Sequence, residues 1–335
     1  MAIAALATEK SNTSIPRSVT LAGVPASGRT QWSPVLRLLE QTGGKANRRK
    51  PILYLHGFTF PSQLCVFWTI EGRSWADALD EAGMSVWGLD FAGFGGSERY
   101  PSMGADTPPA GEPLGRSWDA VEQALRAAKY ILEETGAGKL SLLAHSRGTI
   151  VAGLLAARHP ELIERIVMFG PITERHLTTL PDGLPASVGE LTQWRLVTAK
   201  AQHDRFIADV PPGQPPVLRD QTFKQWAEAY LASDPSSKTR EPPSVKVPSG
   251  PTADLIDAWR GQLAYDPAEI RCPLCVVRGE WDSWSSDDDA AWLLAAAQAS
   301  PLKQYKKIGK GTHLMLFEES RHDLYRATNE FLMRQ

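Results

Sequence analysis

Short apolar runs bounded by turn residues recur along the chain. Six of them have the length of buried or half-buried strands. They read PILYLHG (51–57), SVWGLDFAG (85–93), KLSLLAHS (139–146), ERIVMFGP (164–171), PLCVVRGEWD (273–282) and KQYKKIGKGTH (303–313). Two earlier extended segments, 19–23 and 35–41, predict an antiparallel pair of strands at one edge of a sheet.

Longer segments between these runs carry a helical pattern. In residues 117–134, Val121, Leu125, Ala128 and Leu132 are spaced by four, three and four positions, which places them on one face of a helix. Further candidate helices are residues 146–158, 286–299 and 317–333. Because strands and helices alternate, the pattern predicts an α/β protein with a mostly parallel sheet.

The alternation stops after Pro171 and resumes near Tyr265. The residues between them are rich in proline and contain helical pieces with large aromatic side chains. A structureless loop of this length is uncommon in a compact domain. We therefore expect residues 171–262 to form an inserted, mainly helical cap (lid), and residues 1–170 and 263–335 to form the core.

One strand run ends in AHSRG, where small residues stand two positions to either side of Ser146. Parallel sheets bind ligands beyond the carboxyl ends of their strands. A sharp turn from strand to helix at this place exposes a serine hydroxyl, and it tolerates only small flanking residues because it packs against neighbouring backbone. Ala144 replaces the more usual glycine and is still small. The pattern predicts a nucleophile elbow at Ser146.

Two later strand runs are followed by residues that can activate a serine. Asp282 follows one run, and His313 lies in the loop after the last. The order Ser146, Asp282, His313 is the one expected for a triad on a sheet of this kind. A neutral imidazole can accept the serine proton, and a carboxylate on its far side fixes the tautomer. We predict these three as the catalytic residues.

The stretch LHGFTF after the first parallel run supplies a candidate oxyanion hole. Acyl transfer needs donors for the developing oxyanion, and losing one typically costs about 10²–10³ in rate. We expect the backbone N–H of Phe58 to pair with that of Arg147, with His56 and Gly57 shaping the turn. The Arg147 side chain is expected in a surface salt bridge, with a substrate carboxylate as the alternative partner.

Together these motifs resemble the α/β-hydrolase superfamily, in its chain order. They are the turn at 56–57, DFAGFGGS (90–97), the elbow, GEWD (279–282) and GKGTH (309–313). The resemblance covers most of the chain outside residues 171–262. It implies a mostly parallel eight-stranded sheet with helices on both faces. Haloalkane dehalogenases and most epoxide hydrolases of this fold attack with an aspartate at the elbow, so Ser146 implies acyl transfer through a serine ester.

Other residues compete for some of these roles. Glu280 lies two positions early for the family pattern, and the acidic run 287–289 is typical of a helix N-terminus. Glu174, after the preceding strand, is the alternative triad acid. Four further residues are candidates for contacting the substrate: His145, Trp194, Trp226 and Trp281.

We therefore predict a serine esterase that cleaves a small or medium, partly apolar carboxylic ester, because an aromatic-rich cap can exclude water. An amidase or proline-type aminopeptidase is the first alternative, and carbon–carbon bond hydrolysis of a diketone is another. A non-catalytic ligand-binding protein on the same scaffold is a third alternative, since such proteins can keep a complete triad.

Composition and charge narrow the partners. The 335 residues carry a formal net charge of -2 with no basic stripe, which argues against a nucleic-acid partner. The sequence has no apolar run of the ~18 residues that span a membrane, and the N-terminus lacks a signal peptide's basic region. Three cysteines are too few for a disulfide framework, and CPLC has no second pair for zinc. We expect a cytoplasmic monomer or homodimer with a small-molecule substrate and neither cofactor nor metal.

Overall fold

The computed structural model describes residues 15–23, 32–42 and 47–334. Within these residues, eight strands form one sheet in the order β1-β2-β4-β3-β5-β6-β9-β10. Their bounds are Arg17–Leu21 (β1), Leu36–Glu40 (β2), Asn47–Leu55 (β3), Met84–Asp90 (β4), Leu140–His145 (β5), Ile163–Phe169 (β6), Leu274–Gly279 (β9) and Lys303–Ile308 (β10). β2 pairs antiparallel with β1 and with β4, and all other neighbours pair parallel. The predicted mostly parallel sheet with an antiparallel edge is confirmed.

Burial explains which runs form the centre of the sheet. Every residue of β4 and of β5 is buried, as expected for parallel strands that are covered on both faces. β10 lies at the edge, and its sequence KQYKKI alternates exposed with half-buried residues. Lysines on such an edge strand discourage pairing with another chain.

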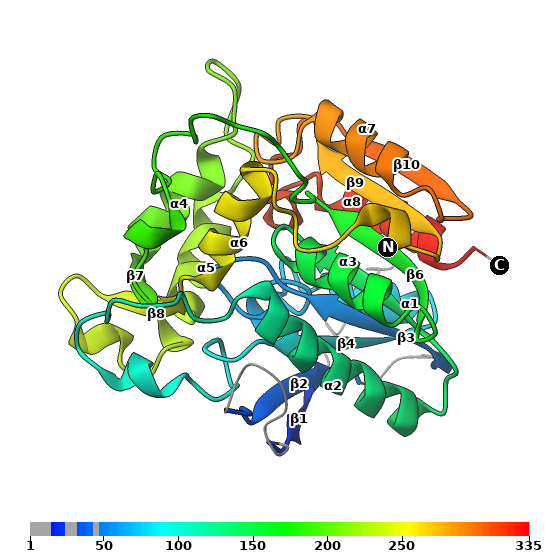
Figure 1. Ribbon diagram of the computed structural model, residues 1–335, viewed down its shortest axis with the longest axis horizontal. Helices are drawn as coiled ribbons and strands as arrows, with labels where there is room; N and C mark the ends of the chain where they lie inside the picture. Colours follow the sequence, from blue (N-terminus) through cyan, green and yellow to red (C-terminus); the bar gives the residue numbers. More distant parts are fainter. Residues whose placement is uncertain (1–14, 24–31, 43–46, 335) are drawn as a thin grey trace, which may run out of the picture.

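Five helices cover the sheet: α1 (Trp75–Glu81), α2 (Ser117–Thr135), α3 (Gly148–Arg158), α7 (Asp287–Ala296) and α8 (Arg321–Leu332). α2 contacts α3, and α1 contacts α8. Figure 1 shows α2 and α3 in front of the sheet and α1 and α8 behind it. The helix predicted from residue 317 begins only at Arg321, because a short 3₁₀ turn, Met315–Phe317, precedes it.

The segment between β6 and β9 leaves the sheet and returns to it, since these two strands are direct neighbours. It contains α4 (Ala199–Ile207), α5 (Asp220–Ala232), α6 (Gly250–Trp259) and an antiparallel pair, β7 (Trp194–Thr198) with β8 (Ser244–Pro248). Figure 1 shows α4, α5, β7 and β8 grouped to the left of the large sheet. The β7–β8 pair was not expected in this segment.

Short 3₁₀ turns complete the path: Ser62–Leu64, Pro101–Gly104, Val188–Glu190, Ser237–Thr239 and Pro267–Glu269. No helix in the described ranges has the length and apolar character that crossing a membrane requires.

Candidate active site

Ser146 occupies a strained turn between β5 and α3. Its φ is 56°, a left-handed conformation that a residue with a side chain rarely adopts. Two hydrogen bonds to the backbone of Ser146 stabilise the turn. Its N–H donates to the Phe169 carbonyl at 2.9 Å, and its carbonyl accepts from Thr149 Oγ1 at 2.6 Å. A Cβ on Gly148 would collide with the carbonyl oxygens of Leu55 and His56. The small residue of the AHSRG motif is therefore required by close packing.

The structure brings Ser146, His313 and Asp282 together. His313 Nε2 lies 2.8 Å from Ser146 Oγ, and His313 Nδ1 lies 3.0 and 2.9 Å from Asp282 Oδ1 and Oδ2. The carboxylate can only accept, so Nδ1 carries the proton and Nε2 is free to accept from the serine hydroxyl. All three residues are buried.

Backbone donors orient the carboxylate of Asp282. Its Oδ1 accepts the N–H groups of Trp284 at 2.9 Å and Ser285 at 3.0 Å. Arg278 braces the same loop by donating to the carbonyl oxygens of Ser285 and Asp282. The predicted alternative, Glu174, lies 3.2 Å from His176 Nε2, whereas the His313 imidazole faces Asp282.

Gly170, directly after β6, makes room for the histidine and the aspartate. Its φ is 53°, and a Cβ there would lie 2.9 Å from the His313 ring and 3.1 Å from Asp282 Oδ2. Sequence reasoning did not assign Gly170 a role. The run ERIVMFGP marked it only as the end of a strand.

Two further residues make hydrogen bonds to the backbone of His313. His145 Nε2 donates to the His313 carbonyl at 2.9 Å, and its ring stacks on Phe169 with 4.4 Å between the centroids. Asp209, just after α4, accepts the His313 backbone N–H at 3.2 Å through Oδ2 and the Ser283 hydroxyl at 2.5 Å through Oδ1. The carboxylate of Asp209 therefore bridges the two loops that carry Asp282 and His313.

The turn at 56–58 lies next to the nucleophile, since a Cβ on Gly57 would be 3.2 Å from Ser146 Cβ. Among the hydrogen bonds of the described residues, none uses the backbone N–H of Phe58 or of Arg147. His56 Nε2 accepts the Phe91 N–H at 3.2 Å, so its proton is on Nδ1, which lies 3.1 Å from the Gly57 carbonyl. Burial lowers the pKa of His56 to about 3, so this histidine stays neutral.

The neutrality of His56 predicts a pH-dependent stability. Unfolded, this histidine takes up a proton below about pH 6.5, whereas the folded chain resists until about pH 3. Its contribution to the free energy of unfolding is thus complete above pH 6.5 and falls by about 1.4 kcal/mol per pH unit below that. The free energy of unfolding of wild type and His56→Gln is measured by urea unfolding between pH 5 and 8. Below about pH 6.5, its change per pH unit should be smaller in the variant by this amount.

A histidine variant elsewhere controls for this prediction. His322 of α8 is exposed, and His322→Gln should keep the wild-type slope. Burial raises the pKa of Glu318 to about 7. Protonation of this carboxyl favours the folded state as the pH falls, opposite to the effect of His56, so the test compares each variant with wild type rather than using the wild-type slope alone. Equal slopes in His56→Gln and wild type would contradict the prediction.

The Arg147 side chain differs from expectation. It is buried, and its guanidinium pairs with Asp254 of α6 at 3.0 Å and donates to the Gly115 carbonyl at 2.6 Å. Arg116 pairs with the other oxygen of Asp254 at 2.8 Å. The salt bridge predicted at the surface is therefore a buried one, because α6 carries its partner into the interior.

The three tryptophans predicted to contact the substrate lie in different surroundings. Trp194 and Trp226 are buried, and their Nε1 atoms donate to the carbonyl oxygens of Ser102 and Leu64, each at 3.0 Å. Trp281 is half-buried in the turn after β9.

Trp284 takes the position beside His313, with ring centroids 6.1 Å apart, and it also contacts Phe58 at 6.2 Å and Trp259 at 5.7 Å. The repeated tryptophans of EWDSW were the only sequence signal for this contact.

A sequence model of the family described as "alpha/beta hydrolase fold" matches residues 50–320. The match covers well over half of the chain. The chain belongs to this family. The resemblance drawn from the motifs is confirmed, and so, at the level of the family, is the prediction of a hydrolase.

Individual relatives of this alpha/beta hydrolase are distant. Sterol esterase 2 of Saccharomyces cerevisiae is 36% identical over 110 residues, which are 30% of this chain and 19% of that protein. The chain thus spans under a fifth of that relative's length.

A serine hydrolase of the polyaromatic-hydrocarbon-degrading bacterium Cycloclasticus zankles has a TM-score of 0.59 at 16% identity and covers 94% of this chain and 97% of its own. A mutant epoxide hydrolase of Vigna radiata has a TM-score of 0.59 at 14% identity, covering 95% and 98%. At these identities the two structures show the fold alone.

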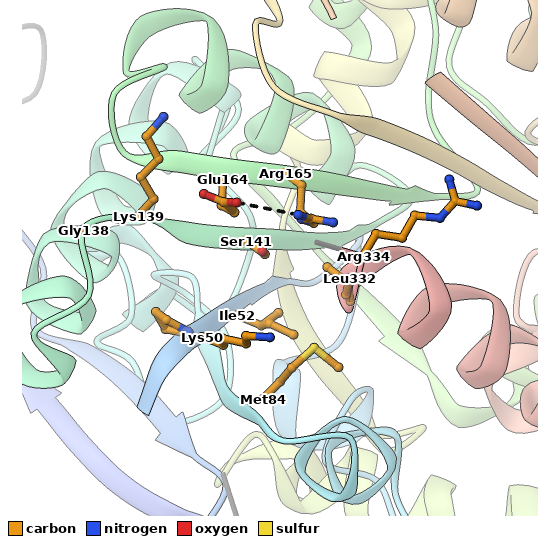
Figure 2. A pocket seen from close by; sticks show the side chains of 11 residues that line it. Lys50, Ile52, Met84, Gly138, Lys139, Ser141, Glu164, Arg165, Leu332 and Arg334 are labelled. Atoms are coloured by element: carbon orange, nitrogen blue, oxygen red, sulfur yellow. Dashed lines mark ion pairs between the residues drawn. The ribbon is translucent and has the colours of Figure 1, made fainter. Parts of the chain in front are cut away.

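A cavity of about 630 Å³ opens far from the triad, at the amino ends of β3, β5 and β6. Figure 2 shows Ile52, Met84 and Leu332 on its walls and the ion pair between Glu164 and Arg165 beside it. Ser146 follows the carboxyl end of β5, so this cavity and the candidate active site lie at opposite ends of the strands.

Proposed function

We propose that the chain is a serine hydrolase that cleaves a carboxylic ester through an acyl-enzyme. The observation that carries this proposal is the continuous hydrogen-bonded path from Ser146 Oγ through the His313 ring to Asp282. Hydrolases of this family with a serine at the elbow use such a path to generate the nucleophile.

In the first half-reaction Ser146 Oγ bonds to the ester carbonyl carbon while its proton passes to His313 Nε2. The backbone N–H groups of Phe58 and Arg147 then stabilise the oxyanion. When the tetrahedral intermediate collapses, the bond to the alcohol breaks and His313 returns the proton to the leaving oxygen. Water then attacks the acyl-serine while the same nitrogen takes its proton. As the bond from the acyl carbon to Ser146 Oγ breaks, His313 returns that proton to Oγ and the acid is released.

The surroundings favour an ester with an apolar portion. Trp284 contacts Phe58, Trp259 and the His313 ring. Trp259 lies in α6, which belongs to the segment that we propose as the cap, residues 171–262. The yeast relative's name, sterol esterase, also favours an ester.

All three cysteines are buried free thiols, and the cytoplasm remains our predicted location.

A covalent probe tests the proposal. Wild-type protein and Ser146→Ala are treated with an alkyl fluorophosphonate and analysed by intact mass and peptide mapping. One adduct, on Ser146 and missing from the variant, is expected; panels of esters, amides and diketones then identify the bond that is cleaved. Folded protein without an adduct from either a large or a small fluorophosphonate would refute an activated serine and favour the non-catalytic alternative.

Asp209 should position the catalytic loops without contacting the ester. Asp209→Ala removes the acceptor for the His313 backbone N–H and the Ser283 hydroxyl, and we expect kcat to fall about tenfold, the value of one or two hydrogen bonds. KM should change less than kcat, because the change acts on the geometry of His313. Steady-state kinetics on an activated ester measures both constants.

Asp209→Asn provides the matched control. The amide oxygen can still accept the His313 N–H, and the Ser283 hydroxyl can rotate to accept from the amide nitrogen. We expect kcat of Asp209→Asn within about threefold of wild type. If the asparagine and alanine variants lost the same activity, the negative charge rather than the two hydrogen bonds would explain the role of Asp209.

A further inference from the structure

Arg205, in α4, is a cation without a carboxylate partner. Its Nη2 donates to Thr59 Oγ1 at 3.0 Å and to Gln202 Oε1 at 2.8 Å. Its Nε is buried and makes no hydrogen bond, and among the described residues no carboxylate forms a salt bridge with it. By contrast, the buried Arg147 has Asp254 as its partner.

The surroundings of Arg205 make this absence costly. The guanidinium carbon lies 5.5 Å from the ring centre of Phe60 and 5.8 Å from that of Phe206. Burial lowers the pKa of Arg205 to about 10, and the charge of Arg195 acts in the same direction, so Arg205 is still a cation at neutral pH. Arg205 as a whole is half-buried, but its Nε is removed from water without an acceptor, which is unfavourable. A bound anion would relieve this cost.

A second arginine reinforces the argument. Arg195 of β7 also has a buried Nε without a hydrogen bond, and burial lowers its pKa. It too has no salt bridge among the described residues. The charge of Arg195 opposes that of Arg205, and the carboxylate of Asp209 offsets part of it without forming a salt bridge with Arg205. Among the described residues the cluster thus holds two arginines without a salt bridge, each with an unpaired Nε.

Arg205 lies next to the candidate oxyanion hole. Thr59, which accepts its hydrogen bond, directly follows Phe58, whose N–H we assign to the oxyanion. Four residues after Arg205, Asp209 holds the backbone of His313. The end of α4 therefore reaches both sides of the proposed reaction centre, and a group held by Arg205 would belong to the substrate.

We propose that the substrate is an ester that carries a carboxylate, and that Arg205 binds this carboxylate. The inference rests on the proposed serine-hydrolase function and extends it to the substrate class. Nη2 already donates to Thr59 and Gln202, so Nε and Nη1 are the guanidinium donors left for the carboxylate. The carboxylate takes no part in the bond changes. Ser146 attacks the ester carbonyl, and the bound carboxylate orients the substrate so that this carbonyl lies next to Ser146.

Two matched series of esters test the inference. The methyl hydrogen esters of succinate, glutarate and adipate are compared with methyl butyrate, pentanoate and hexanoate in a pH-stat assay. The readout is the ratio of kcat/KM between the charged and the neutral ester of each length. At the best length we expect a ratio of at least about ten in wild type, and a ratio at least about tenfold lower in Arg205→Gln, because one charge-assisted pair is lost.

Lys200→Gln is the matched control, because it removes an exposed cation from the same helix. We expect it to keep the wild-type ratio, and Arg205→Lys to give an intermediate one. If the wild-type protein cleaved neutral esters as well as charged ones at every length, the inference would be wrong. Equal losses on both series in Arg205→Gln would show instead that Arg205 only ties α4 to Thr59.

A binding measurement separates this inference from the proposed function. Glutarate and adipate are titrated calorimetrically into wild type and Arg205→Gln, which requires no catalysis. We expect a dissociation constant at least about tenfold higher in the variant. Binding that depends on Arg205 without an adduct on Ser146 would refute the hydrolase but keep the anion site. Adduct formation without such binding and without a preference for charged esters would overturn the anion site alone.

Discussion

Ser146→Ala is expected to lower turnover of an activated ester at least about 10⁴-fold, because the members of a triad act as a unit. The variant should fold like wild type. Its side chain loses one hydrogen bond, to His313 Nε2, while the backbone bonds of the turn remain. A φ of 56° is equally strained for serine and for alanine, so the turn should keep its conformation in the variant. Steady-state kinetics and thermal unfolding measure the two effects separately.

Non-additivity makes this prediction specific. His313→Ala should lose activity to the same order, and the double variant should lose little more, since either change removes the activated nucleophile. Ser236→Ala, at an exposed serine in the segment 171–262, serves as the control and should keep wild-type activity. A Ser146→Ala protein that retained more than about a tenth of wild-type turnover would show that another nucleophile does the chemistry.

The sequence was most informative where a residue's role depends on its immediate neighbours. The elbow needs small residues two positions from Ser146, and the parallel strands need continuous apolar runs, so both could be predicted locally. The chain order of strand ends then brought Asp282 and His313 to Ser146, as the hydrogen bonds of the structure show.

Residues that act through distant contacts could not be predicted in this way. Asp209 meets His313 across 104 positions of the chain, and Asp254 meets Arg147 across 107. The packing of α4 and α6 against the sheet decides these contacts, and no local pattern encodes them. Helix α1 was not predicted, although its capping box at Ser74 and Asp77 is a local sequence signal for a helix start.

Asp282→Asn should lower kcat by about 10³–10⁴ while the protein stays folded, a loss of the size that this change causes in other triads. The direction follows from the two fixed donors. The N–H groups of Trp284 and Ser285 both point at Oδ1, so the asparagine oxygen must occupy that position and the amide nitrogen must occupy the position of Oδ2. That nitrogen then lies 2.9 Å from His313 Nδ1. The oxygen lies 3.0 Å from the same atom, but its two lone pairs already accept the two N–H groups, so the nitrogen is the group left to meet Nδ1.

The amide would therefore donate to Nδ1, and the imidazole proton would move to Nε2, next to Ser146 Oγ. A protonated Nε2 cannot accept the serine proton, so the nucleophile is not activated, even though every side chain keeps its place. Kinetics on an activated ester, with ¹⁵N NMR of the imidazole to assign the tautomer, tests both steps. Near-full activity in Asp282→Asn would contradict the assignment and would make Glu174 the acid to replace next.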